Sequence, residues 1–385
     1  MTSQKLRISF LVLLAIIASE AVADDKSTGT DTEAKTDREI DTRPGMAPDI
    51  RDDESKLKVQ HGNFVAVPIP ISNPTLGDGL VGGAAYFYAQ SDEKQQSQPA
   101  SMTAIAAMYT SSDSKALGIA QQSYWRDDKW RFTGATGAAD IRLSLLAPDE
   151  STSGQSVDWR IKGEFFYAKL ATRVRGNWYG GVLTRLINAE QSFETPASDD
   201  TFDMSSDILS VGVGVYAEYD TRDMPISSYS GRYFKVDALF NDTALGSDST
   251  YQSYNAAYRS YRRLNKSIVL AWELQACHRK GDAPLWDACT VKLRGFPATD
   301  YLGKASGSGQ AELRWQLNKR WGLVGFAGAG IYSSSFNDIR EHQAIPSYGI
   351  GVRFSVLAAK RVNLRVDYAR STDSNAVYVS VGEAF

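Results

Sequence analysis

The chain has 385 residues, of which 43% are hydrophobic, 11% aromatic and 23% charged, and its formal net charge is -3 at pH 7. This balance of charge argues against a dedicated nucleic-acid-binding protein, which would present a basic face. After residue 23 no apolar run approaches the roughly 20 residues that a membrane-spanning helix needs, which excludes a helical membrane protein. A globular protein and a transmembrane β-barrel remain, because barrel strands need only about 9 to 11 alternating residues.

The chain start predicts export. Residues 1–23 carry basic side chains, an apolar run over residues 10–17 and a final Ala-Val-Ala, which is the pattern of a secretory signal peptide. Residues 24–60 are rich in Asp, Thr, Lys and Glu and contain almost no large apolar side chains. We therefore expect a disordered acidic tail in the periplasm.

From about residue 64 onward, apolar residues occur at alternate positions in one segment after another. A period of two is typical of β-strands. The predicted strands cover residues 64–71, 80–90, 102–110, 116–125, 130–140, 157–170, 178–188, 208–220, 232–241, 251–261, 267–278, 309–316, 321–332, 348–357, 362–370 and 376–385. This even number of about sixteen predicts an all-β fold over residues 61–385, a closed antiparallel transmembrane β-barrel of the bacterial outer membrane.

The connections between the predicted strands alternate in length. If the barrel starts in the periplasm, the short connections 126–129, 262–266 and 358–360 are periplasmic turns. The longer connections then lie outside, as in bacterial barrels, over residues 141–156, 189–206, 279–308 and 333–347. Residues 91–100 are an exception, because they come out periplasmic yet long. A slipped count in the first two strands would explain them.

The longest connection contains Leu293-Arg294-Gly295-Phe296, followed by Pro297 and a glycine-serine stretch. This resembles the lid-loop motif of the outer-membrane assembly-factor superfamily, also called bacterial surface antigens, which includes the Bam and Tam barrels and the two-partner secretion transporters. The resemblance implies a sixteen-stranded outer-membrane barrel of a Gram-negative bacterium with this loop folded inside. Arg294 would dock on the inner wall, Gly295 would make the sharp turn and Phe296 would pack. Taken alone, the triplet could also mark a plain turn.

Three further stretches resemble the family in the same order. Asp220, Arg222, Asp223 and Gly231 resemble its periplasmic turn between the eighth and ninth strands. Residues 347–352 and 364–368 resemble its fourteenth and fifteenth strands, and the last residues, up to Phe385, resemble its final strand. The terminal aromatic residue implies that the cell's barrel assembly machinery recognises this chain for its own insertion.

The sequence departs from the family pattern on the thirteenth strand. An acidic residue there commonly receives the lid arginine, whereas residues 326–330 have glycine at that place. Because an unpaired charge taken out of water is costly, Arg294 needs another partner. Alternation places Glu312 and Asp367 on the lumen face, with Asp367 opposite in direction to Val366 and Tyr368. Both carboxylates are candidate partners; the alternative is that they merely line a wet lumen.

The second departure concerns the periplasmic POTRA domains, which capture substrate in most of the family. Residues 24–60 are too few and too polar to form even one such domain. Any client would therefore be met by the barrel itself or by a separate periplasmic partner protein.

Pro68 and Pro70 lie two positions apart in the first predicted strand, so their missing amide donors face the same neighbouring strand. If that neighbour is the last strand, which ends at Phe385, the closing seam lacks two ladder bonds and is the weak point of the barrel. The family resemblance implies lateral opening there. The alternative is that the prolines end the strand early or face the second strand.

Cys277 and Cys289 lie close together in an exported chain, which predicts a disulfide that restrains the base of the lid loop. With a neighbouring histidine they could bind zinc, but their spacing suits a loop staple better, and we predict neither metal nor cofactor. The three histidines, His61, His278 and His342, lack the spacing of outer-membrane phospholipases. We expect no enzymatic activity.

Two functions follow from these features. The first is an assembly-factor barrel that inserts or translocates polypeptide, or moves lipid, by means of the lid loop and a labile seam. Its partners would be outer-membrane lipids and an unfolded polypeptide client, with no nucleic acid, and the barrel would be a monomer. The second is a structural or passive channel barrel without insertase activity.

Overall fold

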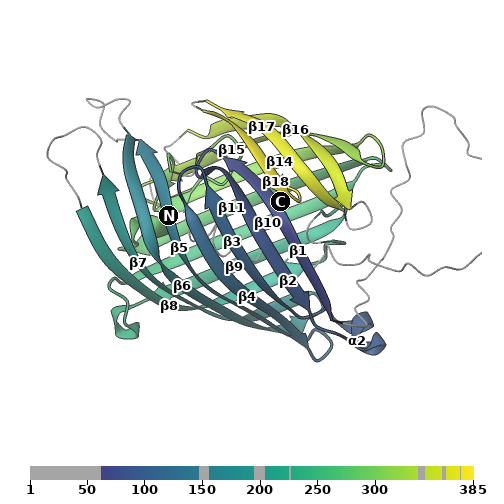
Figure 1. Ribbon diagram of the computed structural model, residues 1–385, viewed down its shortest axis with the longest axis horizontal. Helices are drawn as coiled ribbons and strands as arrows, with labels where there is room; N and C mark the ends of the chain where they lie inside the picture. The colour runs from purple at the N-terminus through teal and green to yellow at the C-terminus, as the bar shows by residue number, and fades with distance from the viewer. Residues whose placement is uncertain are drawn as a thin grey trace, which may run out of the picture.

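The computed structural model describes residues 62–146, 156–194, 204–224, 227–297, 299–336, 343–357, 361–372 and 374–385. Sixteen antiparallel strands close into one barrel (Figure 1). The barrel strands are β1 (Asn63–Asn73), β2 (Gly77–Phe87), β3 (Met102–Thr110), β4 (Lys115–Trp125), β5 (Trp130–Leu146), β6 (Ser156–Arg175), β7 (Trp178–Glu194), β8 (Met204–Asp220), β9 (Gly231–Asn241), β10 (Tyr251–Arg263), β11 (Ile268–Gly281), β14 (Ala305–Gln316), β15 (Trp321–Ser333), β16 (Ile345–Leu357), β17 (Val362–Ser371) and β18 (Asn375–Val381). Each predicted strand overlaps one of them, so the predicted barrel is confirmed.

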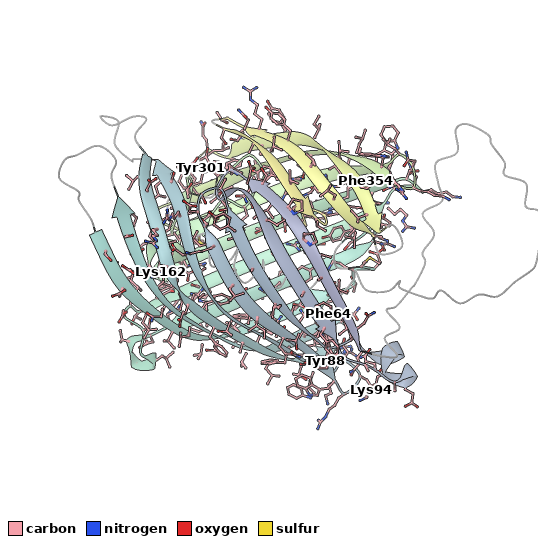
Figure 2. The ribbon with its side chains drawn as sticks, in the orientation of Figure 1. Phe64, Tyr88, Lys94, Lys162, Tyr301 and Phe354 are labelled. Carbon is pink, nitrogen blue, oxygen red and sulfur yellow. A yellow bond between two sulfur atoms is a disulfide. The ribbon has the colours of Figure 1, made fainter. Side chains whose placement is uncertain are left out.

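Each barrel strand pairs with its neighbours in chain order, except that β11 pairs with β14. The intervening β12 (Cys289–Thr290) and β13 (Leu302–Gly303) pair only with each other, within the long connection. We call the end that carries the connections 126–129, 176–177, 264–267 and 317–320 the turn end, and the opposite end the loop end. In Figure 2, Phe64 and Lys94 mark the turn end and Lys162 points toward the loop end.

The predicted alternation of faces holds along the strands. On β17, Asp367 is buried, whereas Val366 and Tyr368 are 41% and 47% exposed on the outer face. On β14, Glu312 and Arg314 are buried, and Leu313 and Trp315 are exposed on the outer face. The outer wall is therefore apolar and the inner wall polar, as a membrane barrel requires.

Residues 91–100 do not reflect a slipped count. They form the connection between β2 and β3 at the turn end, and it is long because it contains the short helix α2 (Asp92–Ser97). No helix among the described residues is long and apolar enough to cross a membrane.

The prediction that residues 141–156 and 189–206 are outer connections is partly wrong. Strands β5 to β8 continue into them and are 17 to 20 residues long. In this extension the inward side chains Ile141, Leu143 and Trp159 are apolar and buried, and the outward Arg142 and Arg160 are polar. The extension lies outside the apolar outer band, so its polarity is reversed, and its charged residues resemble those of a loop in the sequence.

The barrel closes between β1 and β18 through one residue pair, Ser72 with Val379. By contrast, β17 and β18 pair continuously from Leu364 with Val381 to Arg370 with Asn375. The final strand was predicted to reach Phe385 but ends at Val381, because Gly382 has a φ of 90° and turns the chain inward.

The described strand β1 runs past both prolines and pairs with β2 without a break, Pro68 opposite Gly82 and Pro70 opposite Leu80. In an antiparallel ladder, pairs that exchange two hydrogen bonds alternate with pairs that exchange none. Because proline has no N–H, an unbroken ladder requires that both prolines occupy the second kind of position. Their backbone nitrogens then point away from β2, toward the seam.

We expect the double variant Ser72→Cys/Val379→Cys to form a disulfide across the seam. Paired Cα atoms lie about 4.5 to 5.5 Å apart in an antiparallel ladder, within the range that a disulfide spans. Mild oxidation should produce a faster-migrating band on a denaturing gel after heating. The control Ala66→Cys/Val379→Cys separates the thiols by roughly 20 Å along the strand and should not react. Cross-linking of the control instead would disprove this register.

Candidate functional site: the lid loop and the closing seam

The connection from residue 282 to residue 304 crosses the inside of the barrel. Asp287, near its start, pairs with Arg185 of β7, and Arg294, further along, pairs with Asp367 of β17. In the closed order, β7 and β17 are eight positions apart in either direction, so they lie on opposite walls. One loop that contacts both walls must span the lumen.

Arg294 binds both carboxylates that the sequence analysis named as its candidate partners. Its Nη1 lies 2.7 Å from Asp367 Oδ2, and its Nη2 donates to Glu312 Oε1. Nη2 also lies 3.1 Å from Gln310 Oε1, and the guanidinium stacks 3.4 Å from the ring centroid of Phe326. Two charged acceptors, an amide and an aromatic face thus replace the water that the buried cation has lost.

The backbone around Arg294 is also bound to the wall. The Gly295 amide donates to the Tyr378 hydroxyl of β18 at 2.7 Å, and the Gly295 carbonyl accepts from Ser374. The Arg294 carbonyl accepts from Ser347 of β16. Gly295 has a φ of 89°, and a Cβ there would lie 3.1 Å from the Arg370 backbone. Glycine at this position satisfies both the turn and the close approach.

Phe296 packs inside the loop rather than against the opposite wall. It belongs to a buried cluster with Val291, Leu293 and Tyr301, and its ring centroid lies 4.9 Å from that of Tyr301. Gly330 explains the departure on the predicted thirteenth strand, because a Cβ there would lie 2.1 Å from the Val291 side chain. The wall has glycine where the loop approaches it closely; Glu312 lies on the neighbouring strand β14, and Asp367 lies two strands away on β17.

The charges around Arg294 continue to the end of the chain. Glu312 Oε2 lies 2.9 Å from Arg314 Nε, and Arg314 Nη2 donates to the Phe385 carbonyl at 2.9 Å. Asp367 also binds Arg353, whose Nε lies 2.7 Å from Glu383 Oε2. Two chains of alternating charge therefore connect the loop to the residues just behind the seam.

The loop also shares a buried apolar cluster with the other side of the seam. Trp286 is buried in one cluster with Ile69 and Ile71 of β1. Next to it, Asp287 binds Arg185 and Arg279 and accepts from Ser253 at 3.0 Å. The loop thus shares one apolar cluster with β1 through Trp286, and it binds β17 and β18 through the Arg294-Gly295 segment.

The predicted disulfide between Cys277 and Cys289 is present, with a Cα–Cα distance of 5.6 Å. It joins β11 to the loop between the Trp286 contact and the Arg294 contact. The bond therefore fixes the loop at Cys289. The segments before and after Cys289 are held by the separate interactions of Asp287 and Arg294.

The turn motif lies between β8 and β9 at the turn end. Asp220 pairs with Arg222 at 2.7 Å, and Asp223 pairs with Arg361 at 2.6 Å, next to β17. Gly231 has a φ of 103°, and a Cβ there would lie 2.2 Å from the Thr221 carbonyl. These residues fold one turn onto the barrel wall and lie apart from Arg294.

Two of the three histidines, His61 and His342, lie outside the described residues. His278 stacks against Tyr254 and Phe336, with ring-centroid distances of 6.0 and 4.7 Å. Among the described residues no group of three or more His, Cys, Asp or Glu side chains is placed to hold a metal ion.

Comparison with known proteins places the fold and the family. The family model described as Omp85 superfamily domain matches residues 121–385, more than half of the chain. The chain belongs to the Omp85 superfamily. None of the curated proteins is similar enough in sequence to match it.

Solved Omp85 structures share the fold at low sequence identity. BamA from Haemophilus ducreyi, lacking POTRA domains 1–3, aligns with a TM-score of 0.56 at 12% identity over 84% of this chain and 69% of that one. CdiB from Acinetobacter baumannii aligns at 0.54 and 12%, over 83% and 59%, and CdiB from Escherichia coli at 0.56 and 11%, over 83% and 62%. This Omp85 chain thus spans about three fifths of the CdiB chains.

In the charge network around Arg294, the sequence analysis missed Gln310, Arg314, Arg353 and Glu383. Alternation along β14 and β16 places the first three on the lumen face, and that signal was available. Glu383 follows the end of β18 and was predicted to be in a strand. Its place behind the seam depends on the turn at Gly382.

We expect Arg294→Ala to destabilise the folded Omp85 barrel by about 1 to 3 kcal/mol, because hydrogen bonds to two carboxylates are lost while both keep another arginine. The variant should unfold at a lower temperature on a semi-native gel and conduct more ions in a planar bilayer. Arg294→Lys keeps the charge but cannot serve both carboxylates, so an intermediate effect is expected. Unchanged heat resistance and conductance in Arg294→Ala would contradict the docked position.

We expect reduction of the disulfide to loosen the loop without opening the barrel. A bridge that closes a loop of 12 residues contributes about 2 to 3 kcal/mol. Limited proteolysis should cut the loop faster in Cys277→Ser/Cys289→Ser than in the parent, while the heat-resistant band persists. Equal cleavage rates would show that the other contacts hold the loop by themselves.

Proposed function

We propose that this chain is an outer-membrane barrel that inserts polypeptide into the membrane or moves it across, with the closing seam as the exit and the lid loop as the latch. Lipid is a second cargo of the same kind of route. The observation that supports this most is the seam, which has one ladder pair, Ser72 with Val379, and whose β18 strand is bound from inside by a loop that shares an apolar cluster with β1.

The membrane location rests on the apolar outer wall and on the family, whose barrels sit in the Gram-negative outer membrane. Residues 1–23 would direct export and residues 24–60 would form a periplasmic tail; both lie outside the described residues. In this orientation the turn end faces the periplasm and the loop end faces the cell exterior.

The seam is the part of the wall that requires the least free energy to open. Each backbone hydrogen bond contributes on the order of 1 kcal/mol, and more where water cannot replace it. The other neighbouring strands share many residue pairs, such as the unbroken register of β10 and β11 from Tyr251 to Arg263. Beyond Ser72, Pro70 and Pro68 offer no donors to β18, so opening breaks few bonds.

The latch would be released when Arg294 leaves its carboxylates. Arg294 and Glu383 share the same charge network, so movement of the loop unbalances the residues that fold behind the seam. An unfolded polypeptide could then pair by strand addition with the exposed edge of β18, which contains no proline and keeps its backbone donors. No catalytic group is needed, and the work is done by exchange of hydrogen bonds.

Proteoliposomes that contain the purified barrel test the proposal. We expect accelerated folding of a model outer-membrane client, and we expect the oxidised Ser72→Cys/Val379→Cys variant to abolish it. Reduction of that bond should restore the activity, which controls for damage to the fold. The reductant also acts on Cys277 and Cys289, so Cys277→Ser/Cys289→Ser should serve as the background.

Ion conductance without accelerated client folding would instead identify a passive channel. Activity that survives the oxidised lock would exclude the seam as the exit. Any periplasmic partner protein should enhance the reaction through the turn end, because the client arrives from that side.

A further inference from the structure

Most of the tryptophans lie on the outer wall at the turn end. Trp125, Trp178, Trp272, Trp315 and Trp321 are exposed there, and Trp130 pairs with Trp125. The other two of the eight tryptophans, Trp159 and Trp286, are buried inside the barrel at the loop end. An aromatic belt on one side marks the level at which a bilayer changes from hydrocarbon to headgroups.

The belt is continuous over β7 to β11. The Trp178 ring lies 5.1 Å from that of Tyr219 and 6.1 Å from that of Phe234. Phe234 pairs with Tyr258, whose ring lies 5.1 Å from that of Trp272. These side chains define one level around this part of the wall.

Two arginines stand on the outer wall just beyond this level, toward the turn end. Arg232 precedes Phe234 by two residues and Arg262 follows Tyr258 by four, so both share the outward face of the belt. Arg232 pairs with Ser260, which in turn pairs with Trp272. Arg262 is the next outward residue after Ser260. Diagonal neighbours of this kind lie about 7 to 8 Å apart, which lets two guanidinium groups meet on one anion.

Neither arginine has an ion pair among the described residues. The same holds for Arg126, Lys129, Arg175, Lys319 and Arg320, which are also exposed at the turn end, whereas Arg173 there pairs with Asp128. The exposed carboxylates of that end are few, and Asp223 is already paired with Arg361. Toward the loop end, Arg142 pairs with Asp113 and Arg160 with Asp140, while Lys162 is exposed.

We propose that Arg232 and Arg262, with Ser260 between them and Trp272 beside them, bind the phosphate of an anionic glycerophospholipid in the leaflet at the turn end. The proposal rests on the membrane location given above. Arginine binds phosphate through two parallel hydrogen bonds, and the indole ring packs against the glycerol and the upper acyl chain. Because β9 lies eight positions from β1 in the closed order, this lipid sits opposite the seam.

A site in this place holds the barrel in the leaflet on one side and leaves the other side free. The seam can then open without displacing a bound headgroup. The paired arginines at the loop end do not offer a second site of this kind.

Native mass spectrometry of the full chain in detergent with phosphatidylglycerol or phosphatidylcholine tests the proposal. We expect phosphatidylglycerol to be retained preferentially, and Arg232→Gln/Arg262→Gln to weaken its affinity about 30-fold, as for two basic residues at an anionic surface. Arg142→Gln/Lys162→Gln removes the same charge at the loop end and should leave the preference unchanged. Heat resistance on a semi-native gel should confirm that both variants are folded.

Equal retention of the two lipids, or an equal loss in both variants, would overturn the site. Displacement of the lipid by inorganic phosphate at equal concentration would show a general anion site and would also overturn it. Client folding in vesicles of pure phosphatidylcholine separates this proposal from the insertion activity. There the Arg232→Gln/Arg262→Gln variant should match the parent, whichever way the lipid experiment turns out.

Discussion

A guanidinium that leaves water must be surrounded by acceptors, and the inside of this barrel is arranged around that constraint at Arg294. Asp367 and Glu312 receive it, but each also holds another arginine, Arg353 and Arg314 respectively. Because every carboxylate is shared, no single charge can leave without stranding another in a site that water reaches poorly. The loop, three wall strands and the chain end therefore behave as one unit.

The network also explains how a barrel with a weak seam stays closed. A single residue pair joins β1 to β18, and a wall of this kind would fray in the membrane without further support. Support comes from inside, because the loop places Trp286 in the same buried cluster as Ile69 and Ile71 of β1 and binds Tyr378 of β18. The backbone pairing at the seam is therefore weak, and contacts of the loop hold the two sides together. A barrel of this kind can be stable while the loop is in place and can open when the loop leaves.

The outer surface shows a second separation. Exposed tryptophans gather at the turn end, beside basic side chains such as Arg232 and Arg262. Arg232 and Arg262 stand on the wall opposite the seam. The proposed lipid site and the seam that would open therefore lie on opposite sides of the barrel.

The sequence by itself determined the number of strands, the direction of each side chain on β14 and β17, the disulfide and the segment that carries Arg294. These are local properties, since alternation and short motifs depend only on neighbouring residues. Only the tertiary structure decided that β18 stops at Val381, that Pro68 and Pro70 face the seam, and that Arg314, Arg353 and Glu383 complete the charge network. Those features depend on the register at which the first and last strands meet, and closure of the barrel fixes that register between residues more than 300 positions apart in the chain.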